Sequence, residues 1–360
     1  MKIKTLKLSL FLLVITTVFI SCNDDDDGVA IFAEEDRTEQ QEIDNQIILD
    51  YLASHYYNSG FFTSGADHEY SDIIISELPQ DDEGNYLDMP DPANNTLLIN
   101  AVETRTATYL ETDYQYYVLN INQGGGDSPK FTDFLRVKYE GSSINEEVGG
   151  EEDVFDSATT PAEINLQTDF FNTQGAIKAW QLVLPTFNTS TGYGINEFGD
   201  VSFYDAGLGV MFVPSGLAYF SGVSTGSSYD NLIFKFELLQ SEVVDHDNDG
   251  IPSYVEDLND NLDVTDDDSD DDQLFDFIDV DDDGDGVLTL YELIPNEREF
   301  HEDDVEPILN INEFERSRTE PDIDGNIVIK TVTIADYNND GTPDYLDANI
   351  TINYTEESNN

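Results

Sequence analysis

The chain has 360 residues and 39% hydrophobic composition, which is enough for one or two ordinary globular domains. It carries 77 acidic residues against 14 basic ones, a formal net charge of −63, which excludes nucleic acid as a partner because phosphate binding requires clustered Lys and Arg. Repulsion among so many like charges opposes a compact state, so divalent cations are the expected counter-ions.

Residues 1–22 are predicted to be a lipoprotein signal peptide. A basic start precedes the apolar run 8–20, which is shorter than the about 20 residues that a membrane-spanning helix needs. The run ends at Ser21-Cys22, and Cys22 is the only cysteine, so an intramolecular disulfide is excluded. This junction resembles a bacterial lipobox, which implies lipidation of Cys22; an ordinary cleaved signal is the alternative.

Residues 23–33 are predicted to be an acidic tether. Its run of aspartates at 24–27 resembles the surface-export signals of Bacteroidetes lipoproteins, and a plain solvated linker is the alternative. We therefore expect an outer membrane lipoprotein of a bacterial cell envelope, facing either the periplasm or the exterior.

Residues 34–123 are predicted to form a helix followed by strands. Apolar residues recur at three- and four-residue steps over 34–57, which indicates an amphipathic helix. Strands are expected at 72–78 and 113–122, and the glycines at 124–126 indicate a domain boundary. Dimerisation and client binding both remain open as roles for this segment. The predicted apolar face of the helix consists of Ile43, Ile47, Ile48, Tyr51, Leu52 and His55.

Residues 127–240 are predicted to form the functional domain. Short β-like runs alternate there with Gly, Pro and Ser turns, and one helix is expected near 176–184. The segment has no Ser-His-acid order, no Cys nucleophile and no His-rich metal site, so nucleophilic and zinc chemistry are not expected. A set of aromatic residues with one acid remains, which is suited to binding an apolar peptide segment.

Five separated motifs of this domain resemble FKBP-type peptidyl-prolyl cis-trans isomerases. They lie, in the family's order, at 137–141, 154–157, 177–180, 213–219 and 232–239. The resemblance implies an α+β fold in which a twisted antiparallel sheet wraps around one short helix. It also implies rotation about X–Pro bonds in client proteins, a reaction that needs no cofactor.

The resemblance further implies a proline-binding pocket. Trp180 would form its floor, while the Tyr219 hydroxyl and the Ile177 backbone N–H would contact substrate carbonyls. The residues carried over from the family's motifs are Tyr139, Phe155, Asp156, Ile177, Trp180, Tyr219 and Phe234.

The rim of this pocket departs from the family pattern. Ala162 replaces an aromatic residue, Ala179 replaces the helix Gly, and Phe220 replaces the Gly that follows Ala-Tyr. The loop 225–229 lacks an Ile-Pro pair, and residues 188–210 contain an insertion. Two alternatives to an isomerase therefore stay open: a non-catalytic peptide-binding chaperone, and a calcium-dependent surface protein that uses the fold as a scaffold.

Residues 241–350 are predicted to bind calcium. An EF-hand loop supplies oxygen ligands from positions 1, 3, 5, 7 and 12 and has Gly at position 6. Three loops have this spacing, here called the 245 loop (245–256), the 281 loop (281–292) and the 336 loop (336–347). The predicted ligands are Asp245, Asp247, Asp249, Ile251 and Glu256; Asp281, Asp283, Asp285, Val287 and Glu292; and Asp336, Asn338, Asp340, Thr342 and Asp347.

A weaker fourth loop, the 268 loop (268–279), has Gln273 in place of the glycine. No long helices are expected beside these loops, and their rhythm resembles thrombospondin type 3 repeats. That resemblance implies an irregular, extended array with structural calcium. A disordered acidic tail is the alternative.

Overall fold

The computed structural model describes residues 34–63, 67–144, 154–168 and 175–357. The predicted signal peptide, the lipidation at Cys22 and the tether lie outside these ranges. From Arg37 onward the chain forms one compact unit. Among the helices of the described residues, none is long and apolar enough to cross a membrane.

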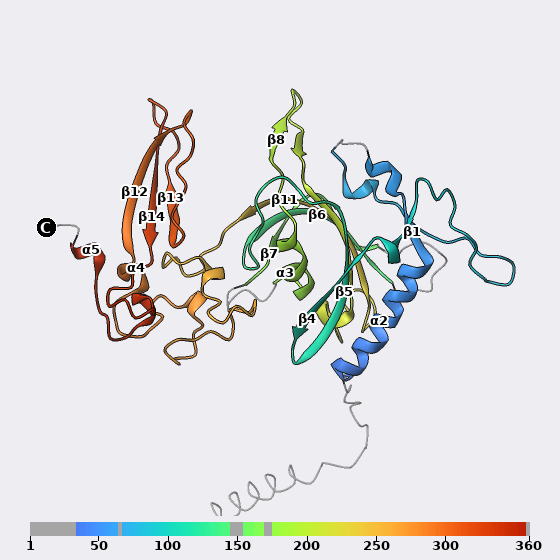
Figure 1. The fold of residues 1–360 in the computed structure, drawn as a ribbon, viewed down its shortest axis with the longest axis horizontal. Helices are drawn as coiled ribbons and strands as arrows, with labels where there is room; N and C mark the ends of the chain where they lie inside the picture. The colour runs from blue at the N-terminus through green and yellow to red at the C-terminus, as the bar shows by residue number, and fades with distance from the viewer. Residues whose placement is uncertain (1–33, 64–66, 145–153, 169–174, 358–360) are drawn as a thin grey trace, which may run out of the picture. The chain divides into compact units, whose positions relative to one another are not determined.

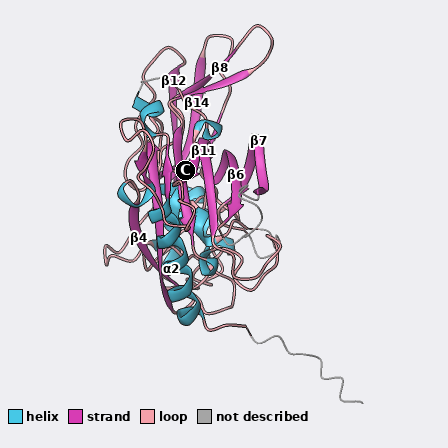
Figure 2. Ribbon diagram, turned by 90° about the vertical axis from the view of Figure 1, so that its right-hand side faces the viewer, coloured by secondary structure: helices cyan, strands magenta, loops and turns pink. Residues whose placement is uncertain are grey.

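A six-stranded antiparallel sheet organises the centre of the chain, with the strand order β4-β5-β10-β11-β6-β7. Its strands are β4 (Glu103–Tyr109), β5 (Thr112–Asn122), β6 (Phe134–Ser143), β7 (Val154–Asn165), β10 (Gly207–Val213) and β11 (Leu232–Glu242). Figure 2 shows β11, β6 and β7 side by side. Mostly antiparallel sheets with few helices confirm the expected α+β class.

Each face of the sheet carries a helix, because side chains alternate between the two faces of a strand. The short helix α3 (Lys178–Val183) covers one face, and α2 (Arg37–Ser54) covers the other. In Figure 1 the two helices lie on opposite sides of β5. The central strands β10 and β11 therefore bury residues on both faces. The buried residues of β11 include the charged Lys235 and Glu237.

The N-terminal helix differs from its prediction in length and in its buried face. It ends at Ser54, and the next three residues form β1 (His55–Tyr57). Ile43, expected on the apolar face, is 55% exposed, whereas Ile48 and Leu52 are fully buried. Four of its buried residues recur at four-residue steps, and the first two of these are polar: Gln40, Asp44, Ile48 and Leu52. Gln41 and Ser54 are buried as well.

The sheet also extends across the expected domain boundary. Strand β5 confirms the strand predicted at 113–122, but it pairs with β10 inside the main sheet. Strand β4 pairs with β5, so both belong to the same layer as the domain expected to begin at 127. Glycines 124–126 connect two strands of one sheet and do not separate two domains.

Smaller elements surround the sheet. β1 pairs with β2 and β3 in a three-stranded sheet. The insertion expected at 188–210 contains the hairpin β8–β9. The strand expected at 72–78 corresponds to β2, which is shorter and spans Ile75–Glu77. These elements are η1 (Ser59–Thr63), η2 (Tyr70–Asp72), β2 (Ile75–Glu77), β3 (Thr96–Leu97), η3 (Leu98–Asn100), η4 (Leu184–Thr186), β8 (Gly192–Ile195), β9 (Val201–Tyr204) and η5 (Ser215–Leu217).

The acidic tail contains more regular structure than the extended array that was expected. A three-stranded antiparallel sheet, β12-β14-β13, follows the 281 loop. Ile251, Leu293, Val332 and Tyr345 form a small buried cluster, so the loops fold around apolar contacts. The elements are η6 (Ser253–Val255), η7 (Asp276–Ile278), α4 (Thr289–Glu292), β12 (Ile294–His301), β13 (Glu313–Arg318), β14 (Asn326–Thr333), η8 (Asp344–Leu346) and α5 (Tyr354–Glu357).

Candidate functional site

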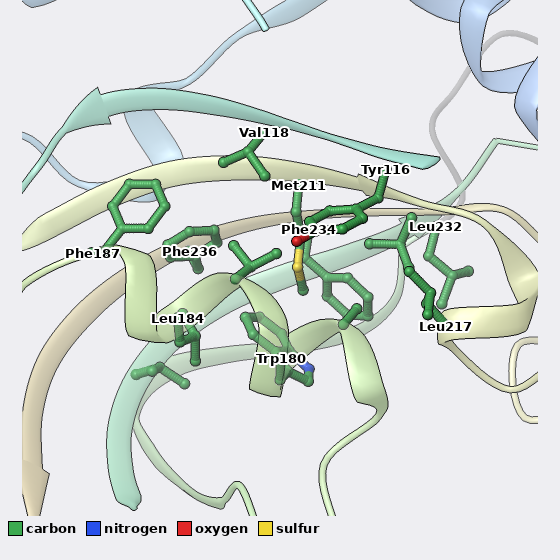
Figure 3. Packing of buried hydrophobic residues seen from close by; sticks show 14 of the residues in the cluster. Tyr116, Val118, Trp180, Leu184, Phe187, Met211, Leu217, Leu232, Phe234 and Phe236 are labelled. Carbon is green, nitrogen blue, oxygen red and sulfur yellow. The ribbon is translucent and has the colours of Figure 1, made fainter. Parts of the chain in front are cut away.

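An aromatic cluster lies between α3 and the sheet. Trp180, on α3, is buried and packs its ring 4.9 Å from that of Phe234 and 5.7 Å from that of Tyr139, centre to centre. Phe155 contacts Phe234 edge to face at 5.7 Å. Figure 3 shows Trp180 pointing from α3 toward Phe234 and Phe236 of the sheet. The structure thus brings together Trp180 and three other residues predicted to line the pocket, Tyr139, Phe155 and Phe234.

Gly141 explains how the rings of Phe234 and Phe155 come so close to the backbone of β6. It pairs with Phe234 across β6 and β11. A Cβ atom at this position would lie 2.7 Å from the Phe234 ring and 2.9 Å from the Phe155 ring. Any larger residue would push the two rings apart, so the glycine of this motif has a packing role.

Tyr139 and Asp156 form a hydrogen bond beside the cluster. The Tyr139 hydroxyl donates to Asp156 Oδ2 over 2.7 Å. Burial, followed by this hydrogen bond, raises the pKa of Tyr139 far above its ordinary value. Burial and the charge of Asp156 also raise the pKa of Tyr219. Both phenols therefore stay protonated at neutral pH and act as hydrogen-bond donors, not as bases.

A hollow of 210 Å³ opens next to Trp180. The predicted pocket residues Ile177, Trp180 and Tyr219 meet there. Its lining consists of Glu163, Ile164, Asn165, Gly175, Ala176, Ile177, Trp180 and Tyr219. A larger hollow of 640 Å³ lies elsewhere, beside Lys138, Glu237 and Asp205, and contains no predicted pocket residue.

Phe220 has a backbone conformation that favours glycine. Its φ is +48°, in the left-handed region that is costly for a bulky residue. Its ring is buried, packs edge to face on Tyr229 at 5.0 Å, and lies 4.0 Å below the Arg37 guanidinium. These contacts offset the strain and hold the turn that carries Tyr219.

A buried carboxylate on α2 anchors the same turn and was not among the residues predicted from the sequence. Asp44 Oδ2 accepts hydrogen bonds from the Ser215 backbone N–H (2.9 Å) and from Ser215 Oγ (2.6 Å). Asp44 Oδ1 accepts one from Gln40 Nε2 (2.7 Å). The signal that could have found it is spacing, because Gln40 and Asp44 continue the stripe of Ile48 and Leu52.

The four acidic loops share one backbone design. In the 245 loop, Asp245 accepts from the Gly250 N–H (3.0 Å) and Asp249 from the Ile251 N–H (2.8 Å). The equivalent hydrogen bonds recur in the 281, 336 and 268 loops. Position 6 has a positive φ in every loop, at Gly250, Gln273, Gly286 and Gly341.

A second hydrogen bond also repeats. The backbone N–H of position 2 donates to the side chain of position 9 in each loop. The pairs are His246 to Ser253 (3.2 Å), Ser269 to Asp276 (2.8 Å), Asp282 to Thr289 (3.2 Å) and Tyr337 to Asp344 (2.8 Å). The weak 268 loop thus folds like the others, although Gln273 replaces its glycine.

Carboxylate oxygens gather inside three of these loops. Groups within 4.8 Å are Asp247, Asp249, Glu256 and Asp282; Asp268, Asp270 and Asp272; and Asp281, Asp283 and Asp285. Burial, then neighbouring carboxylates, raises the pKa of Asp247 to about 9 and that of Glu292 to about 9. Both oxygens of Glu256 and of Glu292 are buried without a hydrogen-bond partner. Such donors fit a hard divalent cation.

The 336 loop differs from the other two predicted calcium loops. The Asn338 amide donates to Asp340 Oδ2 (3.0 Å) and to Asp347 Oδ2 (3.1 Å). Asp336 Oδ1 is buried without a hydrogen-bond partner. An amide donor therefore occupies part of the space where the predicted ligands face each other.

Comparison with known proteins gives partial matches. The family model described as BamM C-terminal matches residues 246–313, from the 245 loop to the start of β13. A search of curated protein sequences gives no match.

Three solved structures are similar to parts of the chain. A peptidyl-prolyl cis-trans isomerase from Pseudomonas syringae pv. tomato covers 58% of this chain and 99% of its own, with 13% identity and a TM-score of 0.31. The match to FkpA from Escherichia coli covers 39% of this chain and 52% of FkpA, with 20% identity and a TM-score of 0.27. The match to the N-terminal domain of FKBP42 from Arabidopsis thaliana covers 39% of this chain and 94% of that domain, with 13% identity and a TM-score of 0.26.

Proposed function

We propose that the central domain is a peptidyl-prolyl cis-trans isomerase that acts on client proteins of the cell envelope. The observation that carries this proposal is the hollow beside Trp180, with the Tyr219 phenol on its rim and the other predicted aromatic residues packed behind it. A pocket of this kind suits a proline ring, which is compact and apolar.

The chemistry required is rotation about one amide bond. Amide resonance creates a barrier of about 18–20 kcal/mol, and the uncatalysed reaction takes tens to hundreds of seconds. A pocket that excludes water disfavours the polar, planar amide relative to the less polar twisted one. The neutral phenol of Tyr219 and the N–H of Ile177 are proposed to hold the flanking carbonyls, so that binding is strongest for the twisted state.

The test is isomerisation of an Ala-Leu-Pro-Phe peptide by the full chain. Tyr219→Phe should lower kcat/KM by about 2- to 10-fold, the effect of losing one hydrogen bond. Trp180→Leu should weaken peptide binding while keeping much of the apolar volume. Because Tyr139 and Tyr219 stay protonated, the rate should be level between about pH 6 and 9. Tyr337→Phe in the exposed tail is the matched control and should have no effect.

The outcome also separates the alternatives. If the wild-type chain binds proline peptides without accelerating their isomerisation, the chaperone function replaces the isomerase. If it neither binds nor isomerises them, only the scaffold role remains. Unfolding of the nearly isosteric Tyr219→Phe variant by urea should stay within about 1 kcal/mol of the wild type, so that lost activity is not lost folding.

We also propose that the tail binds structural calcium. The buried carboxylate oxygens without hydrogen-bond partners in the 245 and 281 loops support this proposal. Asp247, Asp249 and Glu256 would hold one ion, and Asp283, Asp285 and Glu292 a second. Lipidation of Cys22 is proposed to anchor the chain to the outer membrane.

A further inference from the structure

Four carboxylates from two different loops meet in the tail. Asp247, Asp249 and Glu256 belong to the 245 loop, whereas Asp282 belongs to the 281 loop. Ligand atoms of all four lie within 4.8 Å of one another. Glu256 and Asp282 are each 1% exposed, and Asp249 is 2% exposed.

Six of the eight carboxylate oxygens of this group have no hydrogen-bond partner. Both oxygens of Glu256 and both of Asp282 are buried without a hydrogen bond, as are Asp247 Oδ2 and Asp249 Oδ2. Burial removes the hydration of these carboxylates, and their like charges repel each other. A bound cation supplies the attraction that this arrangement otherwise lacks.

The side chain of Asp282 is not at a ligand position of its own loop. It occupies position 2 of the 281 loop, and EF-hand ligands come from positions 1, 3, 5, 7, 9 and 12. The other loops have His246, Ser269 and Tyr337 at this position, none of them acidic. Tyr337 is 67% exposed, whereas Asp282 faces the carboxylates of the 245 loop.

Apolar packing keeps the two loops together. Ile251, at position 7 of the 245 loop, and Leu293, which directly follows the 281 loop, lie in the same buried cluster. Both are fully buried. The approach of Asp282 to Glu256 is therefore supported by contacts independent of charge.

We propose that Asp282 is a ligand of the cation in the 245 loop, so that this ion joins the 245 and 281 loops. The inference rests on the proposed calcium binding and adds a ligand that the loop spacing does not contain. The six carboxylate oxygens without a hydrogen-bond partner match the lower end of the six to eight ligands that calcium takes. The 245 site is then complete only when the 281 loop is folded beside it.

The test uses the full chain with Asp282→Asn, Glu256→Gln and the exposed control Asp304→Asn. Calcium binding is measured by titration calorimetry after chelator treatment, and loop protection by hydrogen exchange. Asp282→Asn should weaken one calcium site by about 10- to 100-fold and abolish calcium-dependent protection of residues 245–256. Protection of residues 281–292 should persist. Glu256→Gln should remove the same ion, and the double variant should lose no other.

Thermal unfolding gives a second readout with a characteristic sign. In chelator, Asp282→Asn should raise the melting temperature, because it removes one charge from a repulsive group. In calcium it should lower the melting temperature, and Asp304→Asn should do neither. A purely structural Asp282 would shift both measurements in one direction, which contradicts the proposal.

The failures are distinguishable. If Asp282→Asn binds calcium like the wild type and keeps the protection of residues 245–256, the shared site is wrong and calcium binding stands. If the wild-type chain binds no calcium, the tail proposal fails together with this one. If Asp282→Asn fails to fold in calcium, its melting temperature in chelator tests the proposal. A melting temperature at or below that of the wild type in chelator overturns it.

Discussion

Asp44 acts on the candidate pocket from the opposite face of the sheet. Its carboxylate is fully buried and holds Ser215 through two hydrogen bonds. The carbonyl of Ser215 in turn accepts the N–H groups of Ala218 and Phe220, each over 2.9 Å. These bonds enclose Tyr219, so α2 positions the phenol that we propose to contact substrate.

We predict that Asp44→Ala destabilises the fold by about 1–3 kcal/mol, because the buried Ser215 N–H loses its acceptor. KM for the proline peptide should rise as Tyr219 shifts. Asp44→Asn keeps an acceptor oxygen and should cost less in both measurements. Urea unfolding and peptide isomerisation check this expectation; equal effects of Ala and Asn would contradict it.

The same residue gives a pH dependence. Burial raises the pKa of Asp44, so the folded state holds this proton more tightly than the unfolded one. Its contribution to stability is therefore complete below the unfolded pKa of about 3.9 and is lost as pH rises through the folded pKa. The stability of wild type relative to Asp44→Asn should fall over that window, and a flat difference would contradict this assignment.

At the scale of elements, the acidic loops repeat one conformation with one exception in sequence. Gly250, Gly286 and Gly341 have φ values of 107°, 93° and 99°, and Gln273 has 83°. A side chain in this region carries a steric cost that glycine avoids. The backbone N–H of Gln273 donates to Asp268, and that of Leu274 donates to Asp272. These two hydrogen bonds hold Gln273 in place despite this cost.

Gln273→Gly should stabilise the tail by about 0.5–1 kcal/mol, the relief of left-handed strain less the added flexibility of the unfolded chain. Gln273→Ala is the control, because it shortens the side chain and keeps the strain. Thermal unfolding in calcium checks the prediction. An equal gain from both variants would mean that the side chain, not the backbone, is responsible.

At the scale of the whole molecule, the tail contacts the region that carries the pocket. Lys178, the first residue of α3, donates to the Leu262 carbonyl over 2.9 Å. Phe131 packs with Val264 and Phe277 of the tail. The loops begin only after β11, so the sequence predicts that calcium matters little to isomerisation. These contacts instead connect the tail to the helix of Trp180.

We therefore predict that removing calcium from the full chain loosens α3. Hydrogen exchange over residues 178–186 should become faster in chelator, while β4 and β5 should keep their protection. Lys178→Met should reduce this calcium dependence, because it removes the donor to Leu262. Unchanged exchange over residues 178–186 would show that the tail and the pocket are energetically independent.

The sequence by itself determined the local features. An EF-hand-like loop is specified within twelve consecutive positions, so its acidic positions, its glycine and its turn could be predicted from spacing. Strand β5 also follows from alternation over neighbouring residues. The aromatic motifs could be recognised because each occupies a short stretch, although their mutual distances could not be derived.

The tertiary structure decided which distant segments meet. Asp44 lies 171 positions from Ser215, and no local period connects them. β5 joins the main sheet through its pairing with β10, although the glycines between β5 and β6 indicate a domain boundary in the sequence. Asp282 resembles any other aspartate of an acidic run until the packing of Ile251 and Leu293 brings two loops together. These contacts depend on chain topology and burial, and spacing along the chain contains neither.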